Sequence, residues 1–330
     1  MDEVTRVGAY REGGRVRCDL RPGALSPRVL STGPGTARVA LVATRALLLG
    51  GDHVRVEVLV GRGVELELVE VSGTVAYAGR GRSASWDVDV RVDVGGLLVW
   101  DALPFVVADG ADVERSTRLA LADGGAQGAG GVALLRETLV LGRTGEAGGR
   151  LRSRTGVELS TPPDARVPRG AATTGESAAP GGSGPAWQHE PTRPQRVHEL
   201  FVEDLDLGDD RALPGILGAA RVVDSVLCLG ARPPVIDAPS GTSPEPTRRA
   251  GPPTPAGPLR LDLDGPGAIA RHLGASTHDA GIDAVVAAWT AAARTARRTA
   301  SPGDDAPPGR AVPSGANLSE PRTTLLTTGA

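Results

Sequence analysis

The chain has 330 residues, of which 36 are basic and 39 are acidic, giving a formal net charge of −3 at pH 7. This balance gives no electrostatic reason to bind nucleic acid or an anionic membrane. Every basic residue is an arginine, so the chain lacks the lysine that P-loop, protein-kinase and Schiff-base chemistry each require.

The first half of the sequence, 1–161, is patterned as strands. Valines and leucines alternate with charged residues over 54–60, 64–68 and 88–94, and glycine-rich turns separate these runs. A period of two places one face of a strand on a core and the other in water. We therefore predict a mainly β fold, a helix-like stack or sandwich of many short strands, rather than alternating strands and helices.

Three segments are rich in proline, glycine, alanine and serine and poor in large apolar residues, namely 162–197, 238–258 and 299–330. Such a composition cannot bury enough surface to offset the entropy of ordering, so we predict two disordered insertions and a disordered tail. Between them, 198–237 continues the β pattern, and 259–298 holds a strand and a helix. We interpret all the ordered parts as one domain.

The predicted helix is the clearest element of the second half. Apolar residues recur at helical spacing at Ile282, Val285, Val286, Trp289 and Ala293. Asp279 can cap its first turn. Arg294, Arg297 and Arg298 suit the negative end of the helix dipole, and we predict that they lie in solvent.

The sequence also bears on location and redox state. Residues 1–6 carry acids and no apolar run, and the apolar stretch 39–49 contains a threonine and an arginine. These features argue against a signal peptide and a membrane-spanning helix, so we predict a cytoplasmic protein. Cys18 and Cys228 are far apart, and we expect two buried thiols rather than a disulfide.

Catalytic patterns are missing from the sequence, and lone acids stand out instead. It contains neither a Gly-x-Ser-x-Gly elbow nor a His-Glu-x-x-His zinc motif, and its five histidines are scattered, so we expect no enzyme. Glu137 is the most informative acid, because Leu135 and Leu139 share its face of a predicted strand. A carboxylate on a dry face must be paired, protonated or bound to a cation.

Several segments occur in the order typical of one protein family. They are Leu-Leu-Gly-Gly-Asp at 48–52, Glu-Thr-Leu-Val-Leu-Gly-Arg at 137–143 followed by Gly145 and Glu146, Val-Glu at 202–203, Gly-Ala-Ile-Ala-Arg-His-Leu at 267–273, and the helix around Trp289. Together they resemble the UreD family of urease accessory proteins, called UreH in some lineages. The chain departs from the family pattern after Trp100, where Leu-Pro and an acid or amide usually follow directly.

The resemblance implies a mainly β fold with about two helices, and a role in inserting nickel into apo-urease. Members of the family bind UreF, which recruits the GTPase UreG, and the assembly docks on the apo-urease subunits. The resemblance also implies that Ni²⁺ passes through an internal channel, as cargo in transit rather than as a tightly bound cofactor. The channel residues of the family match Asp52, Thr74, Glu137 and Glu203 here, with a threonine where other members have serine.

Residues of these types suit a conduit. Several histidines or cysteines would hold Ni²⁺ too tightly for it to move on. Single carboxylates, hydroxyls and water molecules bind weakly and neutralise charge as the ion passes, a compromise also made in ion channels.

Two other functions remain open for a β-rich chain. A binding module for carbohydrate or peptide is the main alternative, and it would need an exposed aromatic platform. The sequence supplies only four tryptophans, two tyrosines and two phenylalanines for this purpose. A glycosidase would need paired carboxylates at a defined separation.

Overall fold

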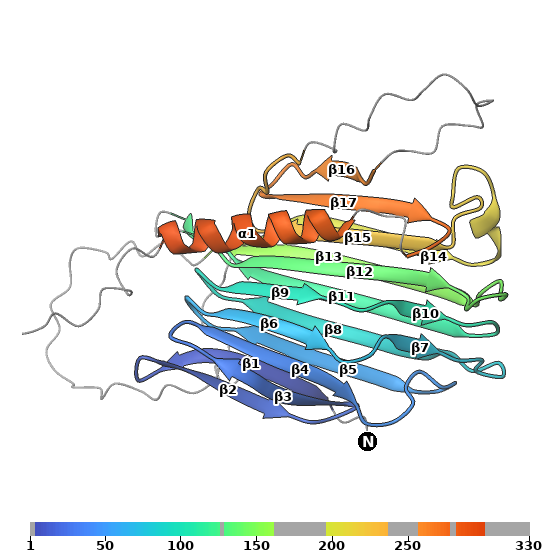
Figure 1. Ribbon diagram of the computed structural model, residues 1–330, viewed down its shortest axis with the longest axis horizontal. Helices are drawn as coiled ribbons and strands as arrows, with labels where there is room; N and C mark the ends of the chain where they lie inside the picture. The colour runs from blue at the N-terminus through green and yellow to red at the C-terminus, as the bar shows by residue number, and fades with distance from the viewer. Residues whose placement is uncertain (1–3, 126–128, 162–195, 237–256, 278–281, 301–330) are drawn as a thin grey trace, which may run out of the picture.

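A computed structural model describes residues 4–125, 129–161, 196–236, 257–277 and 282–300. They form two β-sheets packed face to face, with one helix on the outside (Figure 1), so the predicted mainly β fold is confirmed. About two helices were expected, and the described residues contain one α-helix. The three segments predicted to be disordered lie almost wholly outside the described residues.

The first sheet, sheet A, has seven strands. In spatial order its strands are β14 (Arg196–Leu207), β13 (Arg150–Thr161), β11 (Asp112–Ala122), β8 (Ala84–Val92), β5 (His53–Val60), β1 (Thr5–Glu12) and β2 (Arg15–Arg21).

The second sheet, sheet B, has ten strands. Its main path is β16 (Leu259–Asp262), β17 (Gly267–Gly274), β15 (Val222–Leu229), β12 (Val132–Leu141), β9 (Leu97–Asp101), β6 (Glu65–Glu70), β4 (Thr36–Ala43) and β3 (Leu25–Thr32). Two short strands, β7 (Thr74–Ala76) and β10 (Phe105–Val107), pair with each other, and β10 also pairs with β12.

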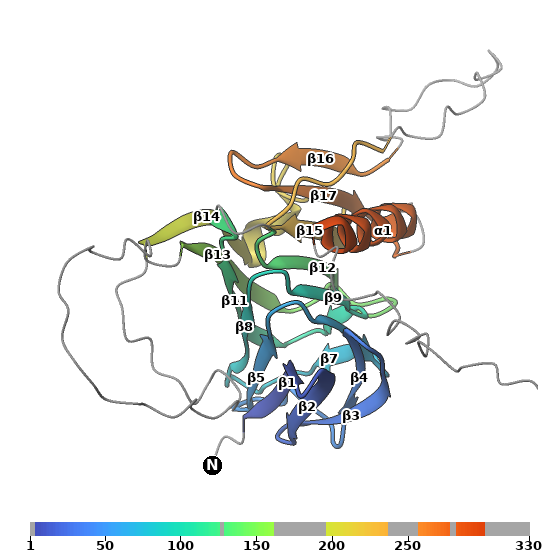
Figure 2. The ribbon, with the colours of Figure 1, turned by 90° about the vertical axis from the view of Figure 1, so that its left-hand side faces the viewer.

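The two sheets are built by one repeated path of the chain. From β5 to β13 the chain crosses between the sheets again and again, and β5, β8, β11 and β13 pair in parallel. In sheet B, β4, β6, β9 and β12 also pair in parallel. This is the helix-like stack that the strand pattern predicts. Figure 2 shows the sheets approaching each other around β2 and β3 and diverging toward β14 and β17.

The main core lies between the sheets because each strand alternates. In β5, Val54, Val56, Val58 and Val60 are all buried. In the middle of the core, the rings of Trp86 and Phe105 meet edge to face, with centroids 5.9 Å apart. Apolar side chains therefore dominate the space between the sheets, and any polar residue there needs a specific explanation.

Helix α1 (Ile282–Ala300) covers the outer face of sheet B (Figure 2). The apolar residues predicted from helical spacing form its buried stripe, which packs on strand residues such as Leu134 and Val226. One sequence expectation is wrong here, because Arg294 and Arg297 do not lie free in solvent. Their side chains approach Glu65 of β6 at 2.7 and 3.6 Å, since the last turns of α1 pass over the outward-facing acids of β6.

Two smaller features complete the fold. A short 3₁₀ helix, η3 (Asp209–Ala212), follows β14. Both cysteines are free thiols, and burial raises the pKa of Cys228 to about 12. Among the described residues, no helix is long and apolar enough to cross a membrane.

Candidate functional site

A group of polar side chains interrupts the apolar interior between the sheets. We call this group the polar band. Its members are Arg115, Thr117, Glu137, Ser153, Thr155, Glu203, Ser225 and Arg271.

Strand pairing places these residues in two facing rows. In sheet A, Thr117 of β11 is opposite Thr155 of β13, which in turn is opposite Glu203 of β14. In sheet B, Glu137 of β12 is opposite Ser225 of β15, which is opposite Arg271 of β17. Arg115 and Ser153 make a further pair in sheet A, one step along the strands. The rows run across the strands, from the middle of the sandwich toward its diverging end.

The first link between the sheets is an ion pair at the inner end of the band. Arg115 Nη2 donates to Glu137 Oε1 at 2.7 Å, and the side chains are only 9% and 12% exposed. Leu135 and Leu139 lie buried on the same face of β12, as the sequence predicted. The carboxylate on this dry face is thus paired with an arginine, one of the states that its burial requires.

The second link closes the outer end of the band. Arg271 of β17 donates two parallel bonds to Glu203 of β14, at 2.7 and 2.8 Å. The Nε atom of Arg271 also donates to Ser225 Oγ at 2.8 Å. A bidentate arginine–carboxylate pair is strong and geometrically specific. The two sheets are therefore joined by a charge pair at the place where they begin to separate.

A cavity of about 40 Å³ lies at the inner end of the band, enough for at least one water molecule or a metal ion. The polar residues that line it include Glu70, Thr74, Trp100, Arg115, Thr117 and Glu137. Two polar atoms there, Arg115 Nε and Thr117 Oγ1, are buried with no hydrogen-bond partner among the described residues. Such atoms are rare in protein interiors, and they mark a place that water or another ligand can fill.

Glu70 is a cavity residue that the sequence reasoning missed. It accepts hydrogen bonds from Trp100 Nε1 and the Leu103 backbone N–H, both at 3.0 Å. Burial raises its pKa, and these two bonds and the nearby charge of Arg115 oppose the rise. The signal was present in the sequence, because Leu66, Leu68 and Glu70 alternate in β6 and must share one face.

The structure brings together two of the four predicted channel residues and places a third at the other end of the polar band. Thr74 and Glu137 line the same cavity, and Glu203 is joined to them through the band. Asp52 lies elsewhere, in the turn before β5, where its carboxylate accepts a hydrogen bond from the Leu49 backbone N–H at 3.1 Å. The described geometry thus gives Asp52 a contact within its own turn and does not place it on the cavity.

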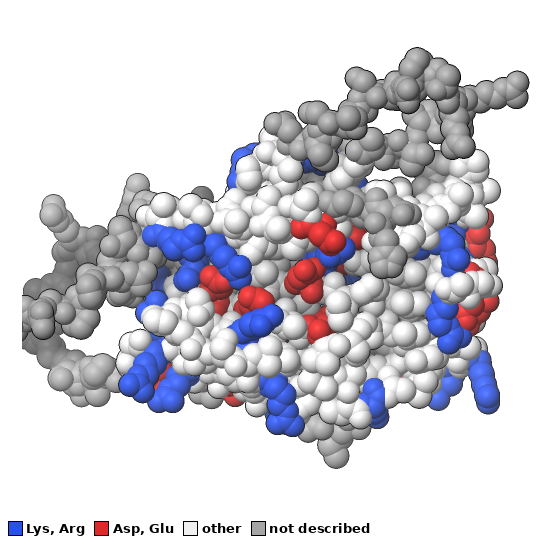
Figure 3. Space-filling view, viewed as in Figure 1, with Lys and Arg blue, Asp and Glu red and all other residues white. Residues whose placement is uncertain are grey.

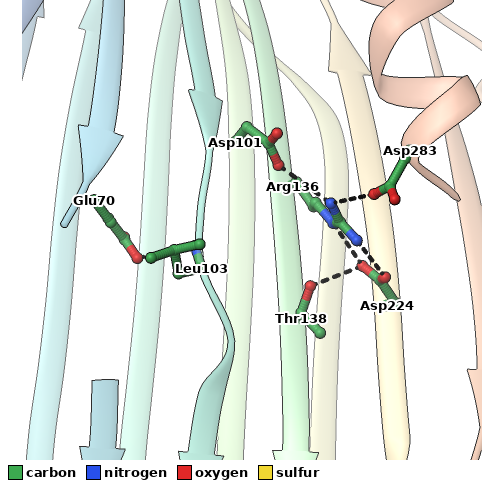
Figure 4. A network of polar contacts seen from close by, with 7 residues as sticks. All are labelled: Glu70, Asp101, Leu103, Arg136, Thr138, Asp224 and Asp283. Atoms are coloured by element: carbon green, nitrogen blue, oxygen red, sulfur yellow. Dashed lines mark hydrogen bonds and ion pairs between the residues drawn. The ribbon is translucent and has the colours of Figure 1, made fainter. Parts of the chain in front are cut away.

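A second polar cluster lies on the opposite face of sheet B, beneath α1 (Figure 4). We call it the helix-side network. Arg136 donates to both carboxylate oxygens of Asp224, at 3.1 and 2.9 Å, and to Asp283 of α1 at 2.7 Å. Thr138 adds a bond of 2.9 Å to Asp224, and Asp101 approaches Arg136 at 3.5 Å. This network ties three strands of sheet B to the first turn of the helix.

Charge in the helix-side network is unbalanced, with three acids around one arginine. Burial lowers the pKa of Arg136, but the hydrogen bonds and charge of Asp224 outweigh it and raise the pKa overall. Burial raises the pKa of Asp101, and Arg136 opposes this. Figure 3 shows acidic and arginine side chains side by side on the face that carries α1. Within the described residues, no three His, Cys, Asp or Glu side chains form a group that could hold a metal ion.

The aromatic residues bear on the alternative of a carbohydrate- or peptide-binding module. Trp86, Trp100, Phe105 and Trp289 are buried, and Trp289 anchors α1. Trp187 lies outside the described residues. The four buried rings serve the two cores, so they cannot belong to an exposed stacking platform.

Comparison with known proteins gives one consistent result. The profile of the family described as "UreD urease accessory protein" matches residues 10–177, just over half of the chain. A protein named urease accessory protein UreD 1, from Streptomyces griseus, is 41% identical over 277 residues, which cover 82% of this chain and 85% of that protein. The urease accessory protein UreD of Frankia alni is 35% identical over 272 residues, covering 80% and 75% of the two chains.

Proposed function

We propose that this chain, which belongs to the UreD family of urease accessory proteins, passes Ni²⁺ to apo-urease and does not itself catalyse a reaction. In this proposal it acts in the cytoplasm as a scaffold and conduit, in a complex with UreF and the GTPase UreG. The observation that carries the proposal is the polar band, because it supplies oxygen atoms across an otherwise apolar interior.

The ligand atoms of the band suit an ion that must be bound weakly and released again. Glu137 and Glu203 supply one carboxylate each, and the hydroxyls of Ser153, Thr155 and Ser225 lie on the neighbouring strands β13 and β15. Carboxylate and hydroxyl oxygens suit Ni²⁺ less well than imidazole or thiolate ligands do. An ion in the band would meet one charged ligand at a time, so each step would hold it only weakly.

The arrangement of the band supports a route for the ion. Thr74 and Glu137 meet at the cavity, and the band leads from there to Glu203 between β14 and β17. In the proposal, Ni²⁺ moves between the cavity and this diverging end of the sandwich. Asp52, in the turn before β5, would contact the ion only outside the band.

The test is the nickel content of urease made together with this chain, UreF and UreG. We expect Glu137→Gln and Glu203→Gln to lower the nickel bound per urease active site, measured by plasma mass spectrometry, because each removes a charged step. The matched control is Glu114→Gln, since Glu114 is an exposed acid on the outer face of β11.

Co-purification separates the two parts of the proposal. If the glutamine variants still form the complex but load less nickel, the conduit is supported. Wild-type nickel content in both variants would reject the conduit. If neither UreF nor apo-urease co-purifies with the wild-type chain, the scaffold role is rejected as well.

A further inference from the structure

Both carboxylates of the polar band are occupied by arginines from the opposite sheet. Arg271 holds Glu203 with two bonds, and Arg115 holds Glu137 with one of 2.7 Å. A cation that binds either carboxylate must therefore compete with a guanidinium. Because like charges repel strongly in a poorly solvated space, the arginine has to move before the cation can bind.

Each arginine also has neutral partners that would remain after such a move. Arg271 donates to Ser225 Oγ at 2.8 Å. Arg115 donates to Ser153 Oγ at 3.5 Å, and its guanidinium lies over the ring of Phe105, 5.4 Å from the ring centre. These contacts do not depend on the glutamates, so each arginine can stay in the band while its carboxylate changes partner.

The cavity beside Arg115 provides space for its side chain to move, and it also contains a second acidic side chain. Arg115 Nε and Thr117 Oγ1 lack hydrogen-bond partners among the described residues, and both residues line the cavity. Glu70 lines it too, and Arg115 is close enough that its charge opposes the rise that burial causes in the pKa of Glu70. Arg115 thus has a second carboxylate within electrostatic reach if Glu137 turns to a cation.

We propose that Arg115 and Arg271 are displaceable counterions, which keep Glu137 and Glu203 closed to divalent cations until a cation is delivered. The inference rests on the proposed function and adds a regulation to the same path. In the resting protein each pair is neutral, so the two partly buried carboxylates are tolerated and offer no net attraction to stray cations. During transfer the carboxylate exchanges its bonds to guanidinium for bonds to the metal, and no covalent bond changes.

The test is Ni²⁺ binding to the purified full-length chain, measured by equilibrium dialysis against nickel chloride. Arg271→Gln and Arg115→Gln should each raise the affinity about tenfold or more, because the glutamate becomes free and the repulsion disappears. Arg271→Lys keeps the charge and should bind nickel as the wild type does. The double change Arg271→Gln with Glu203→Gln should remove the gain.

Two results would overturn the inference. One is an unchanged nickel affinity in both arginine-to-glutamine variants when circular dichroism shows them folded. The other is a gain that persists in the double variant. If Arg271→Gln does not fold, Arg115→Gln decides, since it tests the same exchange at the other bridge. This binding test does not involve urease, so it can fail separately from the test of the proposed function. Glu203→Gln can lower the nickel loading of urease, as the proposed function requires, while the arginine variants bind nickel no more tightly than the wild type. That pair of results would reject the inference and leave the proposed function standing.

Discussion

Arg136 and Glu137 are neighbours in β12, yet they serve opposite faces of sheet B. Arg136 points toward α1 and is bonded to Asp224 and Asp283, while Glu137 points between the sheets and meets Arg115. The outer cluster has a surplus of acids, and its central carboxylate accepts three hydrogen bonds. The inner cluster pairs one arginine with each glutamate and has a cavity beside it.

This difference separates a structural role from an exchangeable one. In the helix-side network the buried Asp224 is fully engaged, and the contacts join α1 to the sheet, so any loosening would cost stability. In the polar band, Arg115 Nε and Thr117 Oγ1 make no hydrogen bond to any described residue. Changes to adjacent residues of one strand can therefore distinguish the two roles.

The largest effect is expected for Arg136→Met. The Asp224 side chain is 0% exposed, and this change would leave its charge without a cationic partner, with only the hydrogen bond from Thr138 remaining. Removing one member of a buried ion pair costs about 3–5 kcal/mol of the free energy of unfolding. Urea denaturation measures this, with Arg118→Met as the control because Arg118 is an exposed arginine of β11. Equal losses in the two variants would contradict a structural role for the helix-side network.

A smaller effect is expected for Glu137→Gln, in the same strand but on the inner face. Glutamine keeps the shape and one acceptor for Arg115, so the loss should be about 1–3 kcal/mol of the free energy of unfolding. The same urea titration measures it, beside Glu114→Gln on the exposed face of β11. A loss as large as that of Arg136→Met would show that the Arg115–Glu137 pair is also needed for stability. That result would count against the proposed exchange of Arg115 for a cation at Glu137.

The sequence predicted the position of Glu137 well and the identity of its partner not at all. Alternation in β12 placed the acid on a dry face, and burial then required a partner. The partner, Arg115, lies 22 residues earlier and in the other sheet. Periodicity gives the face of a residue within its own strand, but it carries no information about which strand stacks opposite.

The same limit explains the other differences. Arg271 is 68 residues from Glu203, and the sequence between them includes a segment outside the described residues. The arginines at the end of α1 matched the helix dipole, which is a local rule, but their ion pairs to Glu65 depend on where the helix lies on the sheet. Thr74 came from family resemblance alone, and the cavity joins it to Glu137.

The smallest effect is expected for Asp283→Asn, at the outer rim of the helix-side network. Asp283 bonds to Arg136 at 2.7 Å, but its side chain is 86% exposed. Water and salt screen such a pair, so the expected loss is about 0–1 kcal/mol of the free energy of unfolding, including the favourable interaction of an acid with the first turn of α1. Because the Debye length falls to about 3 Å in 1 M salt, the difference from wild type should shrink in 1 M sodium chloride. A salt-independent loss of similar size to that of Arg136→Met would mean that Asp283, and not Asp224, is the main partner of Arg136.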